Sequence, residues 1–259
     1  MKKTAKILVV ALVLVMAVSL FAGCGAKNNQ FVVGFDAEFP PYGYKDETGE
    51  YVGFDLDLAA EVCDRMGWKL VKQPIDWDFK DTNLESGLID CIWNGFTCTG
   101  REDKYTWTKP YVDNSQVFVV KADSGIKSKA DLAGKNVAVQ ADSSALSALK
   151  AEENTALKNS FKALVEVGDD NTAFMNLDAG TVDAIAVDIG VADYQLESRS
   201  GSYIILDEAL ATEQYAVGFK LGNTELRDQV QKVIDEMIAD GTFMDYAKKW
   251  GLEDSVIVD

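Results

Sequence analysis

The stretch at residues 90–111 (DCIWNGFTCTGREDKYTWTKPY) has the pattern of a short strand followed by a polar loop. It opens with an apolar run at residues 91–93, which predicts a short buried strand. The loop after that strand carries Asn94, Gly95, Thr97 and Arg101. Ligands of open α/β sheets bind beyond the carboxyl ends of the strands, and arginine holds a carboxylate through two parallel hydrogen bonds. We therefore expect this loop to bind the carboxylate of a small molecule; the alternative is a surface turn with a solvated arginine.

The rest of the chain alternates apolar runs with amphipathic segments. The apolar runs predict strands at residues 31–35, 51–53, 69–73, 117–121, 136–140, 163–167, 184–187, 203–206 and 215–219. Apolar residues at helical spacing predict helices at residues 55–66, 81–86, 144–153, 170–179, 189–197, 224–240 and 242–250. This alternation is typical of an α/β fold with parallel sheets covered on both faces.

One seven-residue pattern, L-x-x-G-x-[IV]-D, occurs twice, at residues 84–90 and 177–183. Each copy describes the end of a helix, a glycine cap and the start of a strand. The repeat predicts two βαβ lobes of similar design. We assign residues 31–112 and 216–259 to lobe 1 and residues 113–215 to lobe 2.

Composition excludes several classes of function. The chain has 259 residues, is 47% hydrophobic and 26% charged, and is therefore globular. Its net charge of −17 opposes nucleic acid and anionic membrane surfaces. It contains no histidine, which excludes Ser-His-Asp and Cys-His catalysis and argues against a transition-metal site. We expect a monomer with no cofactor, no bound metal and no nucleic-acid partner.

The N-terminus has the pattern of an export signal. Lysines precede an apolar run at residues 7–18, which is too short for a comfortable membrane span. Cys24 follows Ala-Gly, as in a bacterial lipobox, although Phe21 stands where leucine is usual. We expect residues 1–23 to be a signal peptide and residues 24–30 a tether lipidated at Cys24. The alternatives are a plain secretory signal or an uncleaved anchor.

The pairing of the remaining cysteines, Cys63, Cys91 and Cys98, stays open at this stage. No two of them have metal-ligand spacing. Buried free thiols are the default, because Cys63 falls in a helical pattern and Cys91 in a strand. A disulfide between Cys91 and Cys98, or between Cys63 and Cys91, is the alternative in an exported protein.

Three further segments resemble a known family. They are FDAEFPPYGYKDETGEYVGFDLDLAAEV at residues 35–62, the loop with Arg101, and DGT-x-x-x-x-AKKWG at residues 240–251. Together they resemble the solute-binding proteins of polar amino-acid ABC transporters (bacterial extracellular solute-binding protein family 3), from residue 31 to about residue 252. The resemblance implies a periplasmic-binding-protein-like type II fold, with two α/β lobes joined by two crossing strands that close on one amino acid.

The resemblance also implies which charged groups hold the ligand. Asp36 and Asp188 would accept from the ligand ammonium, and Arg101 would hold its carboxylate. Ser143 and Ser144, at a predicted helix start, would donate to the same carboxylate. The alternatives are structural: an Asx turn at Asp36 and helix N-caps at the serines and Asp188.

The resemblance assigns the remaining pocket residues as follows. Phe39 and Trp77 would cover the ligand, although aromatic residues more often lie in a core. Asn94, Gly95 and Thr97 would contact its amino and carboxylate groups, and Gln140, together with Asp142, would line the side-chain pocket. The usual Thr-x-x-Arg spacing is shortened here to Thr99-Gly-Arg101, which puts the position of Thr99 in doubt.

The implied function is a receptor outside the cytoplasm, anchored to the membrane only by lipid on Cys24. It would deliver a polar L-amino acid to an ABC transporter permease. Glu38, Asn94 and Gln140 favour a ligand with a hydrogen-bonding side chain, such as glutamine or a cystine half. The alternatives are a dehydratase-like enzyme on the same fold and an amino-acid sensor module.

Overall fold

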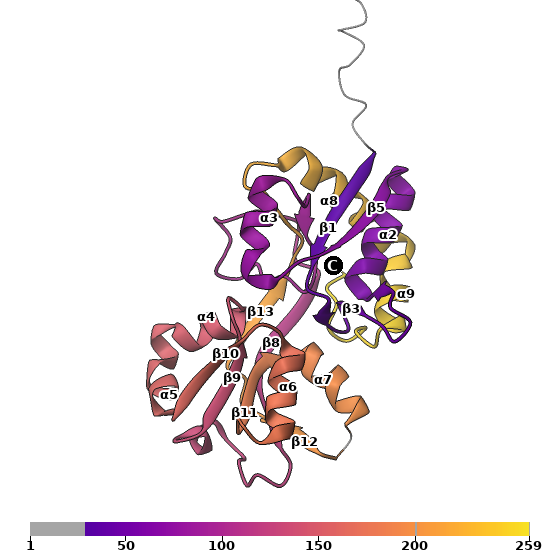
Figure 1. Ribbon diagram of the computed structural model, residues 1–259. Helices are drawn as coiled ribbons and strands as arrows, with labels where there is room; N and C mark the ends of the chain where they lie inside the picture. The colour runs from indigo at the N-terminus through magenta and orange to yellow at the C-terminus, as the bar shows by residue number, and fades with distance from the viewer. Residues whose placement is uncertain (1–28, 200, 259) are drawn as a thin grey trace, which may run out of the picture.

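The computed structural model describes residues 29–199 and 201–258, which form two α/β lobes (Figure 1). The predicted signal peptide and Cys24 lie outside these residues. Lobe 1 is built on a five-stranded sheet and lobe 2 on a six-stranded sheet. The predicted fold class is confirmed. No helix of the described chain is both long enough and apolar enough to span a membrane.

The sheet of lobe 1 is parallel at its centre. Its strands run in the order β5 (Lys69–Pro74), β1 (Gln30–Phe35), β6 (Cys91–Ile92), β14 (Gly218–Phe219) and β7 (Thr106–Trp107). β1 pairs in parallel with both β5 and β6, whereas β14 is antiparallel to its neighbours. A smaller sheet of β2 (Glu38–Phe39), β3 (Gly43–Lys45) and β4 (Tyr51–Val52) follows β1 along the chain.

The sheet of lobe 2 is mixed, so the expectation of purely parallel sheets is wrong for both lobes. Its order is β10 (Ala163–Val167), β9 (Asn136–Gln140), β11 (Ala184–Asp188), β8 (Val112–Lys121) and β12 (Tyr203–Ile205), with β13 (Ala211–Tyr215) also paired to β8. β9, β10 and β11 are parallel, and β8 runs against β11, β12 and β13. The reason is the connectivity: β8 enters from lobe 1 in the opposite direction.

Two antiparallel strands join the lobes, β8 and β13 (Figure 1). Their register runs from Val112↔Tyr215 to Gln116↔Ala211. The predicted strand at residues 117–121 was too short, because β8 starts at Val112. The predicted strand at residues 215–219 is in fact the end of β13 followed by β14. The paired segments of these crossing strands are mainly polar, and their side chains alternate between buried and less buried positions, so that Asn114, Gln116 and Glu213 are buried.

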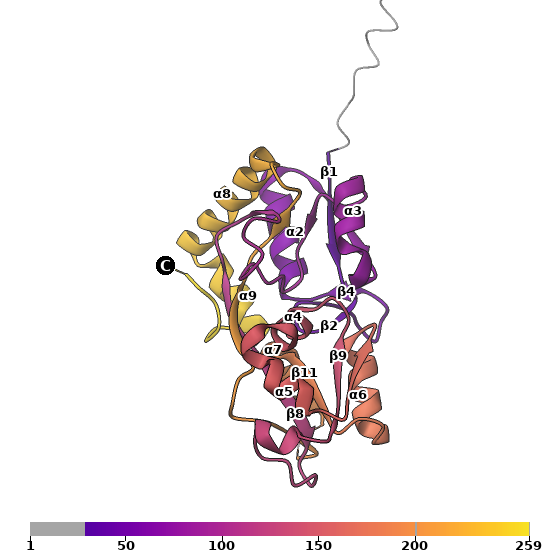
Figure 2. The ribbon, with the colours of Figure 1, turned by 90° about the vertical axis from the view of Figure 1, so that its left-hand side faces the viewer.

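Helices cover both faces of each sheet. In lobe 1, α2 (Phe54–Met66), α8 (Thr224–Asp240) and α9 (Thr242–Lys249) lie on one side of β1, and α3 (Lys80–Ser86) lies on the other (Figure 2). Alternate residues of β1 serve the two faces: Phe31, Val33 and Phe35 pack in the core that contains α2 and α8, and Val32 packs against the cluster around Leu84. This is the period of two expected for a strand buried on both faces.

In lobe 2, α6 (Asp170–Ala179) and α7 (Ile189–Ser198) pack on one face of the sheet, and α4 (Ser144–Lys150) and α5 (Thr155–Ser160) on the other. The predicted helix at residues 144–153 is too long, because α4 ends at Lys150 and the separate helix α5 follows a short 3-10 turn at Glu152–Asn154.

The repeated seven-residue pattern has the same structure in both lobes. Gly87 and Gly180 end α3 and α6 with φ of 76° and 72°, the left-handed conformation that glycine adopts without strain. The final aspartates then brace the neighbouring strand: Asp90 accepts from the Val32 N–H at 2.7 Å, and Asp183 accepts from the Asn136 N–H at 2.8 Å. The predicted similarity of the two βαβ units is thus visible down to single hydrogen bonds.

Cys63, Cys91 and Cys98 are free and buried in the described chain. The default expectation of free thiols is confirmed, and both disulfide alternatives are wrong.

Candidate ligand-binding site

The eleven residues singled out in the sequence line one cavity between the lobes. Lobe 1 and lobe 2 both contribute. The lining residues are Asp36, Phe39, Trp77, Asn94, Gly95, Thr97, Arg101, Gln140, Ser143, Ser144 and Asp188. Their side chains come from strand ends, from the loop after β6 and from the start of α4, where an α/β fold exposes polar groups.

Asp36 and Gln140 connect the two lobes across this cavity. Asp36 directly follows β1 and Gln140 ends β9, and the Gln140 Nε2 donates to Asp36 Oδ2 at 2.7 Å. The Asp36 N–H donates to Asn94 Oδ1 at 2.9 Å, and its carboxylate also accepts from the Glu38 N–H, so the Asx turn is present as well. Burial raises the pKa of Asp36 to about 6, because a carboxylate out of water favours its neutral form.

Asp188 forms a buried acidic pair with Glu213. Asn114 Nδ2 donates to Asp188 at 2.7 Å and to Glu213 at 2.8 Å, and Gln116 Nε2 donates to the same two carboxylates at 2.6 and 2.8 Å. The Tyr215 hydroxyl also donates to Asp188. Burial, followed by the nearby negative charge of Glu213, raises the pKa of Asp188 to about 7. No ion pair is formed by either carboxylate within residues 29–199 and 201–258.

Glu213 was missed in the sequence. The available signal was weak: alternate residues of a strand point to the same face, and Glu213 and Tyr215 both point inward. It could be recognised only after residues 211–214 were assigned to a strand.

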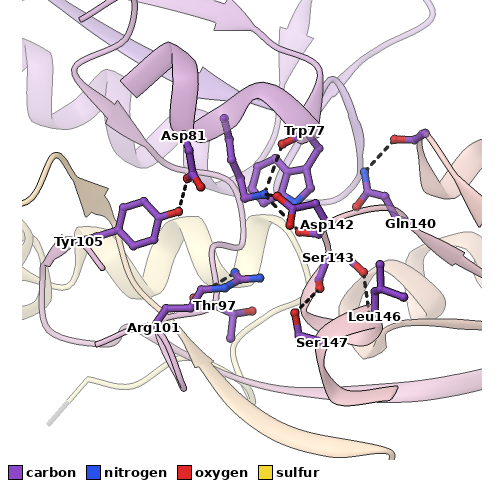
Figure 3. A network of polar contacts seen from close by, with 12 residues as sticks. Trp77, Asp81, Thr97, Arg101, Tyr105, Gln140, Asp142, Ser143, Leu146 and Ser147 are labelled. Carbon is purple, nitrogen blue, oxygen red and sulfur yellow. Dashed lines mark hydrogen bonds and ion pairs between the residues drawn. The ribbon is translucent and has the colours of Figure 1, made fainter. Parts of the chain in front are cut away.

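The two serines at the start of α4 have different partners. The Ser143 Oγ accepts from the Leu146 N–H at 3.1 Å, which is the N-cap bond weighed as the structural alternative (Figure 3). Ser144 Oγ instead donates to Glu213 at 3.1 Å and accepts from Gln116 at 2.9 Å. Ser143 therefore keeps its own proton for a ligand, whereas the Ser144 proton is already directed at Glu213.

Arg101 is half-buried and only weakly held by the protein. Its Nη1 donates to the Thr97 carbonyl at a long 3.4 Å, and its guanidinium lies 5.4 Å from the centre of the Phe96 ring (Figure 3). Across the described chain it forms no ion pair. Thr99 lies elsewhere, since its hydroxyl accepts from the Gln214 N–H at 3.0 Å and it is not among the lining residues.

The aromatic and glycine positions shape the cavity wall. Trp77 is buried in a 3-10 turn, Trp77–Phe79, and its ring meets Phe96 edge-on at 5.5 Å. Gly95 has φ of 55°, and a Cβ atom there would lie 2.7 Å from Cε1 of Phe39. Glycine is thus required at this position both by its backbone conformation and by the close approach of Phe39.

A second contact between the lobes, the ion pair of Lys80 and Asp142, lies beside the cavity and was not predicted from the sequence. The Lys80 ammonium is 2% exposed, forms an ion pair with the Asp142 carboxylate and donates to the Asp142 carbonyl at 3.2 Å (Figure 3). Burial lowers the pKa of Lys80, and Asp142 opposes that shift. Asp142 was expected in the side-chain pocket, but it is not among the cavity-lining residues.

The cavity is suited to a ligand that carries both charges. It places one arginine apart from two buried carboxylates, and the described residues hold no cluster of His, Cys, Asp and Glu arranged to bind a metal ion. Residues 31–253 match the family model of the bacterial extracellular solute-binding proteins, family 3. The chain belongs to this family.

Relatives and solved structures of this family resemble the chain over nearly its whole length. The L-cystine-binding protein TcyJ of Escherichia coli strain K12 is 29% identical over 255 residues, which cover 94% of this chain and 92% of the relative. The crystal structure of Tv2483 bound to L-arginine has a TM-score of 0.84 and 31% identity, and the match covers 89% of this chain and 94% of that one. A substrate-binding protein of an ABC uptake transporter from Streptococcus pneumoniae, with bound histidine, has a TM-score of 0.84 and 34% identity, covering 88% and 95%.

Proposed function

We propose that this member of the family is a receptor that binds a polar L-amino acid between its lobes and delivers it to an ABC transporter permease. The observation that carries the proposal is the charge layout of the cavity. Among the residues that the structure describes, Asp188 and Glu213 form a buried acidic pair without a cationic partner, and Arg101 has no anionic partner. An amino-acid zwitterion supplies both missing charges.

The proposed contacts follow from this layout. Arg101 and Ser143 hold the ligand carboxylate, and Asp188 holds its ammonium. Asp36 was expected at the ammonium as well, but it accepts a hydrogen bond from Gln140, so we assign these two residues to the ligand side chain. Asn94 adds a donor, since its Nδ2 has no hydrogen-bond partner in the part of the chain that the structure describes. Phe39 and Trp77 enclose the ligand, and Gly95 and Thr97 contact its amino and carboxylate groups.

Ligand binding and lobe closure are one event in this proposal. Contacts already span the cleft: Gln140 to Asp36, Lys80 to Asp142, and the Tyr194 hydroxyl to the Tyr44 hydroxyl at 3.1 Å. A closed cleft excludes water, and charges interact more strongly where water is excluded. The ligand adds its own contacts to both lobes and so favours the closed state.

The ligand is best identified by a thermal-shift screen of the twenty L-amino acids and L-cystine. A ligand stabilises the folded state in proportion to the logarithm of its concentration over Kd, so about 100 Kd of ligand adds about 2.7 kcal/mol. We expect the largest shifts from polar amino acids, with glutamine and cystine as the first candidates. The TcyJ relative is named for L-cystine, and two similar structures hold L-arginine and histidine, so these ligands belong in the screen. No shift with any amino acid would contradict the proposal.

We further propose that the mature protein starts at Cys24, with residues 1–23 removed and residues 24–29 serving as tether, one residue shorter than expected because Gln30 pairs with Lys69 in the lobe 1 sheet. Lobe 1 then comprises residues 30–112 and 216–259, and lobe 2 residues 113–215. Mass spectrometry of the N-terminal peptide from membranes tests the anchor: a diacylglyceryl group on Cys24 is expected, and an unmodified mature Cys24 would exclude it. Sedimentation of the soluble part tests for the expected monomer.

The proposal assigns the cavity to binding and not to chemistry. Incubation of the protein with linear and cyclic amino acids, followed by product analysis, separates this function from a dehydratase-like one. Unchanged ligand is the expected result.

A further inference from the structure

Glu213 is buried where the two lobes and the crossing strands meet. It lies on β13, is 8% exposed and is not one of the eleven cavity-lining residues. A buried carboxylate without a cationic partner is costly unless it accepts several hydrogen bonds or faces a ligand cation. The hydrogen bonds that Glu213 accepts therefore bear on the cavity next to it.

A single oxygen of Glu213, Oε1, accepts from both lobes and from the crossing strand β8. The Thr97 hydroxyl of lobe 1 donates to it at 2.8 Å, and the Ser144 hydroxyl of lobe 2 donates at 3.1 Å. The Asn114 and Gln116 side-chain nitrogens of β8 also lie within hydrogen-bond distance of it, at 2.8 Å each.

These contacts determine whether the hydroxyls of Thr97 and Ser144 can donate hydrogen bonds to a ligand or only accept them. A hydroxyl group has one proton and two lone pairs. The protons of Thr97 and Ser144 are both used by Glu213, so only lone pairs remain for the cavity. Thr97 keeps two, and Ser144 keeps at least one: Gln116 Nε2 lies 2.9 Å from the Ser144 oxygen, and its two protons serve two of the three acceptors Ser144, Asp188 and Glu213.

We propose that Glu213 is a positioning residue for the ligand ammonium: it takes the hydroxyl protons of Thr97 and Ser144 and leaves both oxygens as acceptors beside Asp188. The inference rests on the proposed function, since it presupposes a ligand with an ammonium group. A primary ammonium has three N–H donors, and Thr97, Ser144 and Asp188 offer three acceptors from three elements. Ser144 then contacts the ammonium and not the carboxylate, which is left to Arg101 and Ser143.

The test compares amino acids with their deaminated analogues. The probes are L-glutamine and glutaramic acid, L-histidine and imidazole-4-propionic acid, and L-arginine and 5-guanidinopentanoic acid. Calorimetric titration gives the Kd for each member of a pair. The ratio of the analogue's Kd to the amino acid's Kd measures how strongly the site selects the ammonium. The variants are Glu213→Gln, which retains an acceptor oxygen but loses the charge, and Glu213→Met, which loses both.

The matched control is Asp113→Asn. Asp113 is a carboxylate on the same pair of crossing strands, but it is exposed and accepts from Gln214 Nε2 at 2.9 Å on the outer face. Its replacement removes one negative charge from the crossing strands without touching the hydroxyls, so the ratio should stay within about twofold of wild type.

We expect the ratio to fall by about tenfold in Glu213→Gln and by up to about a hundredfold in Glu213→Met, as for lost hydrogen bonds to charged groups. If the amino acid and its analogue lose affinity to the same extent, so that the ratio stays within about threefold of wild type in both variants, Glu213 has only a structural role and the inference is overturned. Melting curves show whether the Met variant folds. If it does not, the ratio measured for Glu213→Gln tests the inference. Wild type that binds none of the amino acids would overturn the proposed function itself, which distinguishes the two failures.

Discussion

Replacement of Arg101 by alanine should separate ligand affinity from fold stability. The side chain donates one long hydrogen bond at 3.4 Å and stacks on Phe96 at 5.4 Å, so its loss should lower the free energy of unfolding by about 1 kcal/mol or less. The ligand carboxylate, in contrast, would be left in the closed cavity without its cation. Truncating one partner of such a pair costs about 2–5 kcal/mol, or about 30-fold to several thousand-fold in Kd.

Two further variants sharpen this experiment. Arg101→Lys should recover only part of the affinity, because an ammonium cannot reproduce the planar pair of donors. Arg199→Ala is the matched control: its guanidinium lies 5.2 Å from the Phe174 ring, a similar stack, but it is paired with Asp178 on the surface of lobe 2. Its removal should leave Kd unchanged.

Calorimetric titration with the amino acid that gives the largest thermal shift provides Kd, and urea unfolding provides stability. The reasoning is refuted if Arg101→Ala binds within about threefold of wild type, a difference below about 1 kcal/mol. The ligand carboxylate would then lie elsewhere in the cleft.

Two other predictions concern pH and backbone shape. Burial raises the pKa of Asp188 to about 7, so the ligand-free protein holds a proton there that the ligand ammonium must displace; burial also raises the pKa of Asp36 to about 6. The Kd should therefore rise by up to about tenfold per pH unit as the pH falls below about 7. The unfolding free energy of the ligand-free protein should decrease as the pH rises from about 4 to about 7, because the folded state holds protons that the unfolded state has already released. A pH-independent Kd in calorimetry would contradict this prediction. Gly95→Ala should lower the unfolding free energy by about 2–4 kcal/mol through left-handed strain and the clash with Phe39. Gly87→Ala, at φ 76° with open space around its Cβ position, should cost only about 1–2 kcal/mol, and equal losses in urea unfolding would refute the role of the clash.

Local patterns in the sequence determined most of the architecture. Apolar runs and helical spacing located the central strands and the long helices, because these elements are set by which neighbours in the chain are apolar. The repeated L-x-x-G-x-[IV]-D pattern identified the two βαβ units, since a left-handed glycine and a bracing aspartate are local requirements. The eleven candidate site residues lie around one cavity, because they end strands or start helices at the same edge of two sheets.

The tertiary structure alone decided the crossing strands and the polar groups behind the cavity. Residues 112–116 (VDNSQ) and 211–214 (ATEQ) are almost entirely polar and contain no apolar run, so their strand character appears only when they pair with each other. Glu213 acquires its role from Thr97, which lies 116 residues away in the chain, and Lys80 from Asp142, which lies 62 residues away. A buried charged group is defined by the partners that compensate its lost hydration. Those partners come from the opposite lobe or the crossing strands, and no spacing within the sequence specifies them.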